Sequence, residues 1–472
     1  MTRGFLSGLV VTIALSVGPS AQSGADWTRF GFDAGRSNAS TADTGITAAN
    51  IATLKRQQIT LDDSVDASAI YLAGVTVFAH THDVLFLTTS YGQTVAIDAA
   101  DGTTLWTYTP AAYSSWFGSA QITTATPVAD PDRRFIYAAS PDGRIQKLGI
   151  ATGRVVWSTA ITQLPQREKI ASSLNYFNGR VIATTGGYVG DAPPYQGHVA
   201  VLDASTGALL HVWNSLCSHR PGLLDPRTCP ESGSAIWGRA GAVVDADSGD
   251  IFVATGNGRW DGQTYWGDAT IELDPDAARM VGSYTPVNTA DLDFADLDIG
   301  STSPVLVGGG LLMQSGKDHQ VRLLSIEQMR TASPPTGGEL QTVATPSGSA
   351  LFTALAVWKT AAGDTWIFNA DGGATAGLLL RDGLLRQQWR TSDPGTSPVV
   401  AGGLLYVHDP RGGLRVLDPT TGRPAATLDC GGGHWGSPIV VPGLIALPDF
   451  RGRTTPSVLN IWRLPSPRGA GS

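Results

Sequence analysis

Four aspartates alternate with other residues in the stretch DLDFADLDIGSTSP, which runs from 291 to 304. In an extended segment, residues two apart project to the same face, so Asp296 and Asp298 are expected to converge. Adjacent carboxylates repel each other unless a proton or a cation lies between them. The run therefore predicts a site for a proton or a cation. A solvated acidic loop that caps backbone amides is the open alternative.

Other side chains that commonly do chemistry are arranged less suggestively. His80 and His82 form a His-x-His pair without a third metal ligand nearby in the sequence, and we interpret the pair as structural. The chain has no glycine-rich phosphate loop and no Gly-x-Ser-x-Gly nucleophile motif. It also has no Cys-x-x-Cys-His motif, so we expect no c-type haem domain.

The N-terminal stretch MTRGFLSGLVVTIALSVGPSAQSGADW has the pattern of a secretory signal peptide. Arg3 supplies the positive charge, residues 5–17 are apolar, and small residues follow. The apolar run is shorter than the ~20 residues that span a bilayer. We therefore expect residues 1–25 to be removed and the mature chain, without a membrane span, to be periplasmic or secreted.

Export makes a disulfide plausible, because the compartments outside the cytoplasm are oxidising. Cys217 and Cys229 flank the loop SHRPGLLDPRT, and this spacing predicts a local bridge between them. Cys430 is then expected to be unpaired and buried between strands.

The composition favours an all-β protein of considerable size. The chain has 472 residues, more than one hydrophobic core normally serves, with 57 Gly, 28 Pro and only 15% charged residues. Short runs of Val, Ile, Leu and Thr are broken by Gly, Asp and Pro, as strands and turns require. The net charge is −8 and no Lys/Arg run occurs, which argues against nucleic-acid binding.

One phrase recurs along the chain: an apolar strand ending in Asp, a Thr-Gly or Asp-Gly turn, and a strand ending in Trp or Tyr. Copies lie at 95–110, 147–161, 199–214, 271–286, 378–390 and 414–429. Glycine supplies the positive φ of a tight turn, and the terminal Trp is expected to fill the gap between neighbouring sheets. An isolated hairpin cannot bury such faces, so the repeats must stack.

The repeat spacing predicts a β-propeller of four-stranded antiparallel blades. We place eight blades at about 84–110, 125–161, 171–214, 236–286, 302–328, 350–391, 396–430 and 435–463, with seven blades as the alternative. The last blade is short of one strand, which NIATLKRQQITLD at 50–62 could supply. One propeller domain would then fill residues 26–464, followed by a disordered tail at 465–472.

The repeated phrase resembles the repeat of pyrroloquinoline quinone (PQQ) enzymes and their non-catalytic relatives. ADWTRFGFDAGRSNAS at 25–40 is similar to the start of mature quinoprotein alcohol dehydrogenases, and TGITAANIATLK at 44–55 continues in the same register. The resemblance covers essentially the whole mature chain. It implies the fold more specifically than the activity, because related propellers serve as scaffolds.

Two segments resemble the parts of that family that contact the cofactor. GSAIWG at 233–238 resembles the segment whose Trp forms the floor under the quinone, which implies that Trp237 stacks on the cofactor beside Gly233 and Ser234. Packing between blades is the alternative for Trp237. ATGNGRWDG at 254–262 resembles the turn whose Asn binds Ca²⁺, which implies that Asn257 is a metal ligand. A hairpin turn is its alternative.

The resemblance also assigns roles to the acidic run. The equivalent of Asp296 is the base that takes the alcohol proton, and Asp298 matches an aspartate that coordinates the metal in lanthanide-dependent members. SGKDHQVRLLS at 315–325 resembles the segment whose Lys or Arg contacts the quinone oxygens, so Lys317 would polarise a quinone carbonyl. The alternative for Lys317 is a channel-rim lysine paired with Asp318 or with the aspartates of the run.

Two departures from the family pattern stand out. The adjacent cysteine pair that covers the other face of the quinone is missing, and the segment 184–203 contains Asp191 but no Glu where the family has a metal ligand. The prediction is an exported quinoprotein oxidoreductase that uses PQQ and Ca²⁺ or a lanthanide ion to oxidise an alcohol or a sugar. An external acceptor would take the electrons. The alternative is a non-catalytic propeller that acts as a binding or envelope-assembly scaffold, so enzymatic activity is open at this point.

Overall fold

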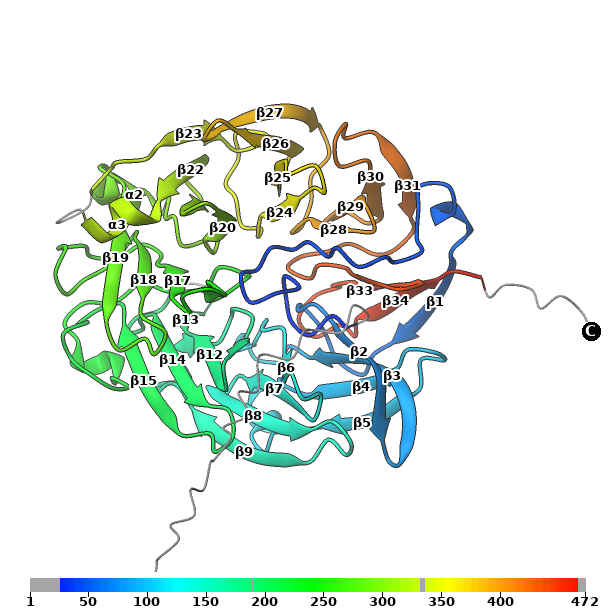
Figure 1. The fold of residues 1–472 in the computed structure, drawn as a ribbon. Helices are drawn as coiled ribbons and strands as arrows, with labels where there is room; N and C mark the ends of the chain where they lie inside the picture. The colour runs from blue at the N-terminus through cyan, green and yellow to red at the C-terminus, as the bar shows by residue number, and fades with distance from the viewer. Residues whose placement is uncertain (1–25, 189–190, 332–335, 466–472) are drawn as a thin grey trace, which may run out of the picture.

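Eight four-stranded antiparallel sheets are arranged in a ring in the structure, a computed structural model (Figure 1). It describes residues 26–188, 191–331 and 336–465. The expected signal peptide, and all of the expected tail except Pro465, lie outside the described residues. The fold is the predicted β-propeller, and it has eight blades rather than seven.

The first four blades follow one another along the chain. Their strands are β2–β5 (Ile70–Val77, His80–Thr88, Thr94–Asp98, Thr104–Tyr108), β6–β9 (Val128–Ala129, Phe135–Ser140, Arg144–Gly149, Val155–Ala160), β11, β12, β14 and β15 (Asn175–Phe177, Arg180–Thr184, His198–Asp203, Leu209–Asn214) and β16–β19 (Val243–Val244, Ile251–Ala254, Thr270–Leu273, Met280–Tyr284). A separate two-stranded sheet pairs β10 (Glu168–Lys169) with β13 (Gly186–Gly187).

The other four blades complete the ring. Their strands are β20–β23 (Val305–Gly308, Leu311–Ser315, Gln320–Ser325, Gln341–Ala344), β24–β27 (Ala356–Lys359, Thr365–Ala370, Thr375–Arg381, Leu384–Thr391), β28–β31 (Val399–Ala401, Leu404–His408, Leu414–Leu417, Pro424–Leu428) and β32–β34 (Ile439–Val441, Leu444–Pro448, Val458–Arg463) with β1 (Lys55–Thr60). The helices are short: α1 (Tyr113–Trp116), α2 (Thr289–Ala295), α3 (Ile326–Thr331), and two 3₁₀ turns at Ile51–Thr53 and Pro226–Thr228.

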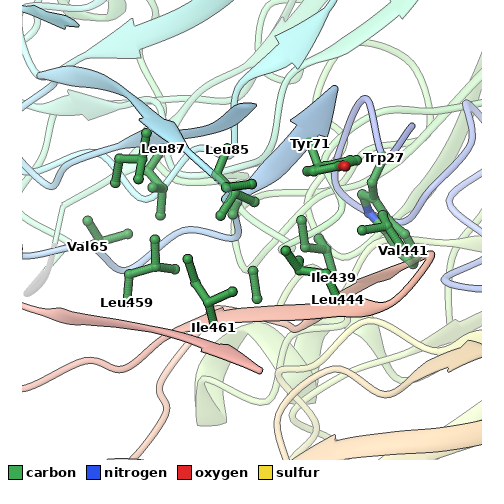
Figure 2. Close-up of a cluster of buried hydrophobic side chains, with 14 of the residues drawn as sticks. Trp27, Val65, Tyr71, Leu85, Leu87, Ile439, Val441, Leu444, Leu459 and Ile461 are labelled. Atoms are coloured by element: carbon green, nitrogen blue, oxygen red, sulfur yellow. The ribbon is translucent and has the colours of Figure 1, made fainter. Parts of the chain in front are cut away.

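The ring closes as the sequence predicted. β1 pairs antiparallel with β34, from Lys55 opposite Arg463 to Thr60 opposite Val458, so the last blade takes its fourth strand from the N-terminal part of the chain. A buried apolar cluster joins this blade to the first one, with Leu459 and Ile461 facing Leu85 and Leu87 (Figure 2). Closure therefore removes an exposed sheet edge and buries an apolar face at once.

Two predicted blades were too short. The first was placed at 84–110 and lacked β2, whose register shifts between Leu72 and Val75 because Gly74 interrupts the apolar alternation. The fifth was placed at 302–328 and lacked β23, which is separated from β22 by α3. Both strands were hidden because their local pattern departs from the repeat.

The recurrent Trp and Gly of the repeat belong to one inter-blade contact. Trp106, at the outer strand of the first blade, donates a 2.8 Å hydrogen bond from Nε1 to the carbonyl of Ile150 in the second. A β-carbon on Gly153 would lie 2.7 Å from the Trp106 ring. The turn glycine of one blade is therefore required by the tryptophan of the preceding blade, in addition to its φ of +68°.

An N-terminal segment, residues 27–44, lies against the inner strands of several blades and crosses the centre of the ring in dark blue (Figure 1). Trp27 and Tyr71 of β2 exchange two 2.8 Å backbone hydrogen bonds. The same segment bonds Val244 of β16, Val357 of β24 and Val400 of β28. These bonds satisfy backbone groups on strand edges that the sheets leave unpaired.

The cysteines behave as predicted. Cys217 and Cys229 form a disulfide, packed against the buried side chains of Leu216 and Leu224. Cys430 is free and buried.

Candidate functional site

Three aromatic rings from blades that are not neighbours meet in the middle of the ring. Trp237 lies just before β16, and its ring centroid is 6.1 Å from that of Phe352, which precedes β24. Phe352 lies 6.0 Å from Trp435, which precedes β32. Rings from the fourth, sixth and eighth blades can touch only across the central channel. All three are half-buried, and we refer to Trp237, Phe352 and Trp435 as the channel aromatic cluster.

This position separates Trp237 from the inter-blade tryptophans, which lie on outer strands. The loop before β16 positions it through close backbone packing. The amide of Ser234 donates to the carbonyl of Asn257 at 2.6 Å, and that of Gly256 donates to the carbonyl of Ala235 at 2.7 Å. A β-carbon on Gly256 would lie 3.3 Å from Trp237 Nε1.

The backbone of Gly233 and Ser234 packs closely against the turn at Asn257. A β-carbon on Gly233 would lie 2.7 Å from the carbonyl oxygen of Asn257. The Ser234 hydroxyl is buried and donates to the carbonyl of Trp266 at 2.8 Å. Both residues therefore support the turn, and direct contact with a cofactor stays a prediction for them.

Lys317 connects Trp237 to the acidic run. Its Nζ lies 5.4 Å from the centroid of the Trp237 ring, 2.5 Å from Asp296 Oδ1 and 2.5 Å from Asp298 Oδ2. Asp318 pairs with Arg322 instead. Lys317 is thus paired with the aspartates of the run and also faces the channel aromatic cluster.

The acidic run is not the extended segment that we predicted. Residues 289–295 form helix α2, and Asp296 ends it in the left-handed conformation with φ of 53°. Thr and Ala at the start of a helical turn, with Asp291 in the first turn, favour a helix here. The left-handed residue reverses the chain, so Asp296 and Asp298 both reach Lys317, but by a helix end rather than by strand alternation.

The two aspartates have different surroundings. The Asp296 side chain is 66% exposed, whereas that of Asp298 is 0% exposed. Burial raises the pKa of Asp298 to about 6, although the charge of Lys317 opposes this shift. Burial alone would lower the pKa of Lys317, but the charges of Asp298 and Asp296 outweigh it and raise that pKa. Lys317 and Asp298 therefore hold each other in their charged forms at neutral pH.

Sequence reasoning missed Asp268, which lies near Asp298 and two residues before β18. It is fully buried, and burial followed by the charge of Asp298 raises its pKa to about 8. Asp268 Oδ2 and Asp298 Oδ1 have no hydrogen-bond partner. Lys317 Nζ lies 2.5 Å from the other oxygen of Asp298, Oδ2. A single Asp after Gly267 carries no signal that distinguishes it in the sequence.

The unpaired oxygens of Asp268 and Asp298 are possible ligands of the predicted metal ion. Carboxylate and amide oxygens are the donors that hard cations prefer. A β-carbon on Gly256, the residue before Asn257, would lie 3.5 Å from Asp298 Oδ1, so the Asn257 turn and Asp298 are adjacent. Among the described residues, no group of three or more His, Cys, Asp or Glu could hold a metal ion by itself. A cation here would fit these donors only with further oxygens from a bound ligand.

Known proteins resemble this chain over limited lengths. A family model described as outer membrane protein assembly factor BamB matches residues 64–259. Quinohemoprotein alcohol dehydrogenase ADH IIB of Pseudomonas putida is 27% identical over 244 residues, which are 44% of this chain and 34% of that protein. Quinohemoprotein alcohol dehydrogenase of Comamonas testosteroni is 25% identical over 334 residues, 63% of this chain and 43% of that protein. The chain thus spans less than half the length of these two curated relatives.

Solved structures extend the likeness to the whole fold. The crystal structure of the Comamonas testosteroni quinohemoprotein alcohol dehydrogenase superposes with a TM-score of 0.69 and 16% identity, covering 95% of this chain and 82% of that chain. A europium-containing methanol dehydrogenase superposes with a TM-score of 0.70 and 15% identity, covering 94% of this chain and 99% of that chain. The family match, the curated relatives and the shared fold together support the resemblance of this chain to PQQ-repeat β-propellers.

The residues matched by the family model end at 259, two residues after Asn257. Trp237 and Asn257 therefore lie inside the matched region, whereas Asp296, Asp298 and Lys317 lie beyond it. In the ranges that the structure describes, none of the helices is both long enough and apolar enough to cross a membrane.

Proposed function

We propose that this propeller is an exported quinoprotein-type oxidoreductase that oxidises an alcohol or a sugar and passes the electrons to an external acceptor. The observation that supports this most strongly is the placement of Lys317. Its ammonium group lies 5.4 Å from the ring centroid of the half-exposed Trp237 and is held between two carboxylates. The names of the relatives agree with this chemistry, since they are quinohemoprotein alcohol dehydrogenases.

The channel offers what PQQ requires. A planar tricyclic ring would lie against the indole of the half-buried Trp237. Lys317 is held next to that face by Asp296 and Asp298, so its positive charge would stabilise negative charge that develops on a quinone oxygen. When bound, PQQ supplies the capacity to accept two electrons and a proton.

The acidic residues would supply the catalytic base and one of the metal ligands. The exposed Asp296 can receive the proton of a substrate hydroxyl, since in the described part of the chain its side chain pairs only with Lys317 and solvent reaches it. Asn257 and the buried Asp298 would hold a Ca²⁺ or lanthanide ion, with Asp298 offering the unpaired Oδ1. Loss of one carboxylate relative to the family pattern predicts weaker Ca²⁺ binding than a full set of ligands would give.

Titration of the apo protein with PQQ, in the presence of Ca²⁺ or La³⁺, tests the proposal. We expect saturable changes in cofactor absorbance and reduction of a dye with some members of an alcohol and sugar panel. Trp237→Ala should weaken PQQ binding, while Trp358→Ala, which removes a half-buried tryptophan on β24, should leave it unchanged. Asp296→Asn should reduce turnover without weakening PQQ binding, while Asp293→Asn in the same acidic run should do neither.

Absence of saturable PQQ binding would overturn the oxidoreductase proposal. The alternative function, a non-catalytic propeller that binds or assembles envelope components, would then stand. One observation favours that alternative: the family model that matches residues 64–259 is described as an assembly factor.

A further inference from the structure

A lysine on the small two-stranded sheet is buried without a partner among the described residues. Lys169 belongs to the two-stranded sheet in which β10 pairs with β13. Its neighbour Glu168 is fully buried and engaged by the Thr162 hydroxyl, the amide of Gln196 and the imidazole of His198. Adjacent residues of a strand point to opposite faces, so this network directs Lys169 to the other side.

Lys169 is only 7% exposed, yet its ammonium group makes no hydrogen bond or ion pair with any residue in the described ranges. The charged groups around it are Arg239, Asp66, Arg453 and Asp191. Asp66 is already occupied, since Oδ2 contacts His434 at 2.7 Å and Oδ1 accepts the Trp435 amide. Burial, followed by the charge of Arg239, lowers the pKa of Lys169 to about 7.

Arg239 is a second buried cation without an acid. It is 5% exposed, and its guanidinium lies 4.4 Å above the ring of Trp435. Nη1 donates to the Thr124 hydroxyl at 2.8 Å and Nη2 to the carbonyl of Trp237 at 3.3 Å, while Nε has no partner. Arg239 forms no ion pair within the part of the chain that the structure describes.

Two buried cations that repel each other are costly, and the nearby charge of Asp66, which acts on both, does not outweigh their burial. Functional sites are where such an arrangement is retained. Arg239 also lies beside the channel aromatic cluster, since it bonds to the carbonyl of Trp237 and lies over Trp435, and Lys169 lies within electrostatic reach of Arg239. Flat ring faces next to unpaired cations are suited to an aromatic molecule that carries carboxylates.

We propose that Lys169 and Arg239 are the anion-binding part of the channel site and bind carboxylate groups of a planar aromatic polycarboxylate whose ring lies against the channel aromatic cluster. This rests on the proposed function in one respect, namely that PQQ, a tricyclic tricarboxylate, is the member of that class expected here. These two residues are distinct from Lys317, which Asp296 and Asp298 already neutralise.

The test compares binding by tryptophan fluorescence in the wild type, Lys169→Met, Arg239→Met and the exposed control Lys55→Met. The probes are PQQ, its trimethyl ester and benzene-1,3,5-tricarboxylate. A charged hydrogen bond to a carboxylate contributes about 1.5–3 kcal/mol, so each channel variant should weaken PQQ binding by about tenfold or more. The trimethyl ester should bind the wild type and the variants equally, since its carboxylate charges are gone.

Thermal unfolding of the apo proteins supplies a second measurement. Replacing an unpaired buried charge with an apolar side chain should raise the midpoint of Lys169→Met, whereas a purely structural lysine would lower it. Arg239→Lys keeps the charge and should retain more PQQ affinity than Arg239→Met. A variant that fails to fold is therefore distinguished from one that folds and binds weakly.

The outcomes separate the two proposals. If PQQ binds the wild type and both channel variants with equal affinity, the anion site is wrong and the oxidoreductase proposal survives. If PQQ does not bind but benzene-1,3,5-tricarboxylate does, in a manner that depends on Lys169 and Arg239, the anion site stands and the oxidoreductase proposal falls. If neither probe binds the wild type, both are overturned.

Discussion

Replacing Asp268 with asparagine should stabilise the folded protein at alkaline pH and leave its stability nearly unchanged near pH 4. Asp268 is fully buried, and only Oδ1 has a partner, the amide of Ile299 at 3.3 Å. Asparagine keeps that carbonyl acceptor and carries no charge. It also tolerates the left-handed backbone at this position, where φ is 50°.

The magnitude follows from the pKa of the buried carboxyl. Burial and the charge of Asp298 raise the pKa of Asp268 from 3.8 to about 8. A raised pKa means that the folded state keeps its proton when the unfolded chain has lost it, so stability falls as pH rises from about 4 to about 8. At about 1.4 kcal/mol per pH unit, the cost above pH 8 reaches about 6 kcal/mol as an upper limit. Asp298 titrates first, near pH 6, while Asp268 is still neutral.

Urea unfolding of the wild type and Asp268→Asn between pH 4 and 9 measures this effect, with the exposed Asp293→Asn as the matched control. The stability difference should open between about pH 4 and pH 8 and then level off. A loss of stability in Asp268→Asn at pH 8 to 9 would refute the reasoning, because it would mean that the charged carboxylate is needed. Stabilisation of the wild type alone by added Ca²⁺ or La³⁺ would then identify a cation between the two carboxylates.

Three further predictions concern the ring and the site. Gly153→Ala should lower the unfolding midpoint clearly more than Gly179→Ala, because both have positive φ but only the first brings a β-carbon within 2.7 Å of Trp106; equal losses would show that the stacking contact is soft. Lys317→Met should destabilise the protein by about 3–5 kcal/mol at pH 8, since it leaves Asp298 buried and charged, and by less below pH 6, where that carboxyl takes up a proton; a pH-independent loss in urea unfolding would contradict this. Reducing the disulfide, whose cysteines are 12 residues apart, should cost about 3 kcal/mol, measured as the shift in unfolding with and without reductant; no shift would mean that the loop is held by packing alone.

The amount of the site that was predictable depended on how local its signals are. Trp237, Asn257, Asp296, Asp298 and Lys317 lie in recognisable segments, and the structure brings Lys317 to Trp237 and to both aspartates. The predicted geometry of the acidic run was wrong, because the alternating aspartates indicated an extended strand where a short helix forms. Helix α2 and an extended segment both place residues of this run near one another, so the sequence pattern could not separate them.

The chain's own repeat determined the propeller, because each hairpin carries its turn glycine and its tryptophan within about 15 residues and cannot bury its faces alone. The closing strand was also predictable from the sequence, since the last repeat lacked one strand and the N-terminal segment at 50–62 could supply it. Tertiary structure alone decided which single residues share the channel. Lys169, Arg239, Phe352 and Trp435 come from different parts of the ring, and nothing in their local sequence encodes a partner more than 60 residues away. Burial and unpaired charge are properties of the closed ring, and they arise only when all eight blades are in place.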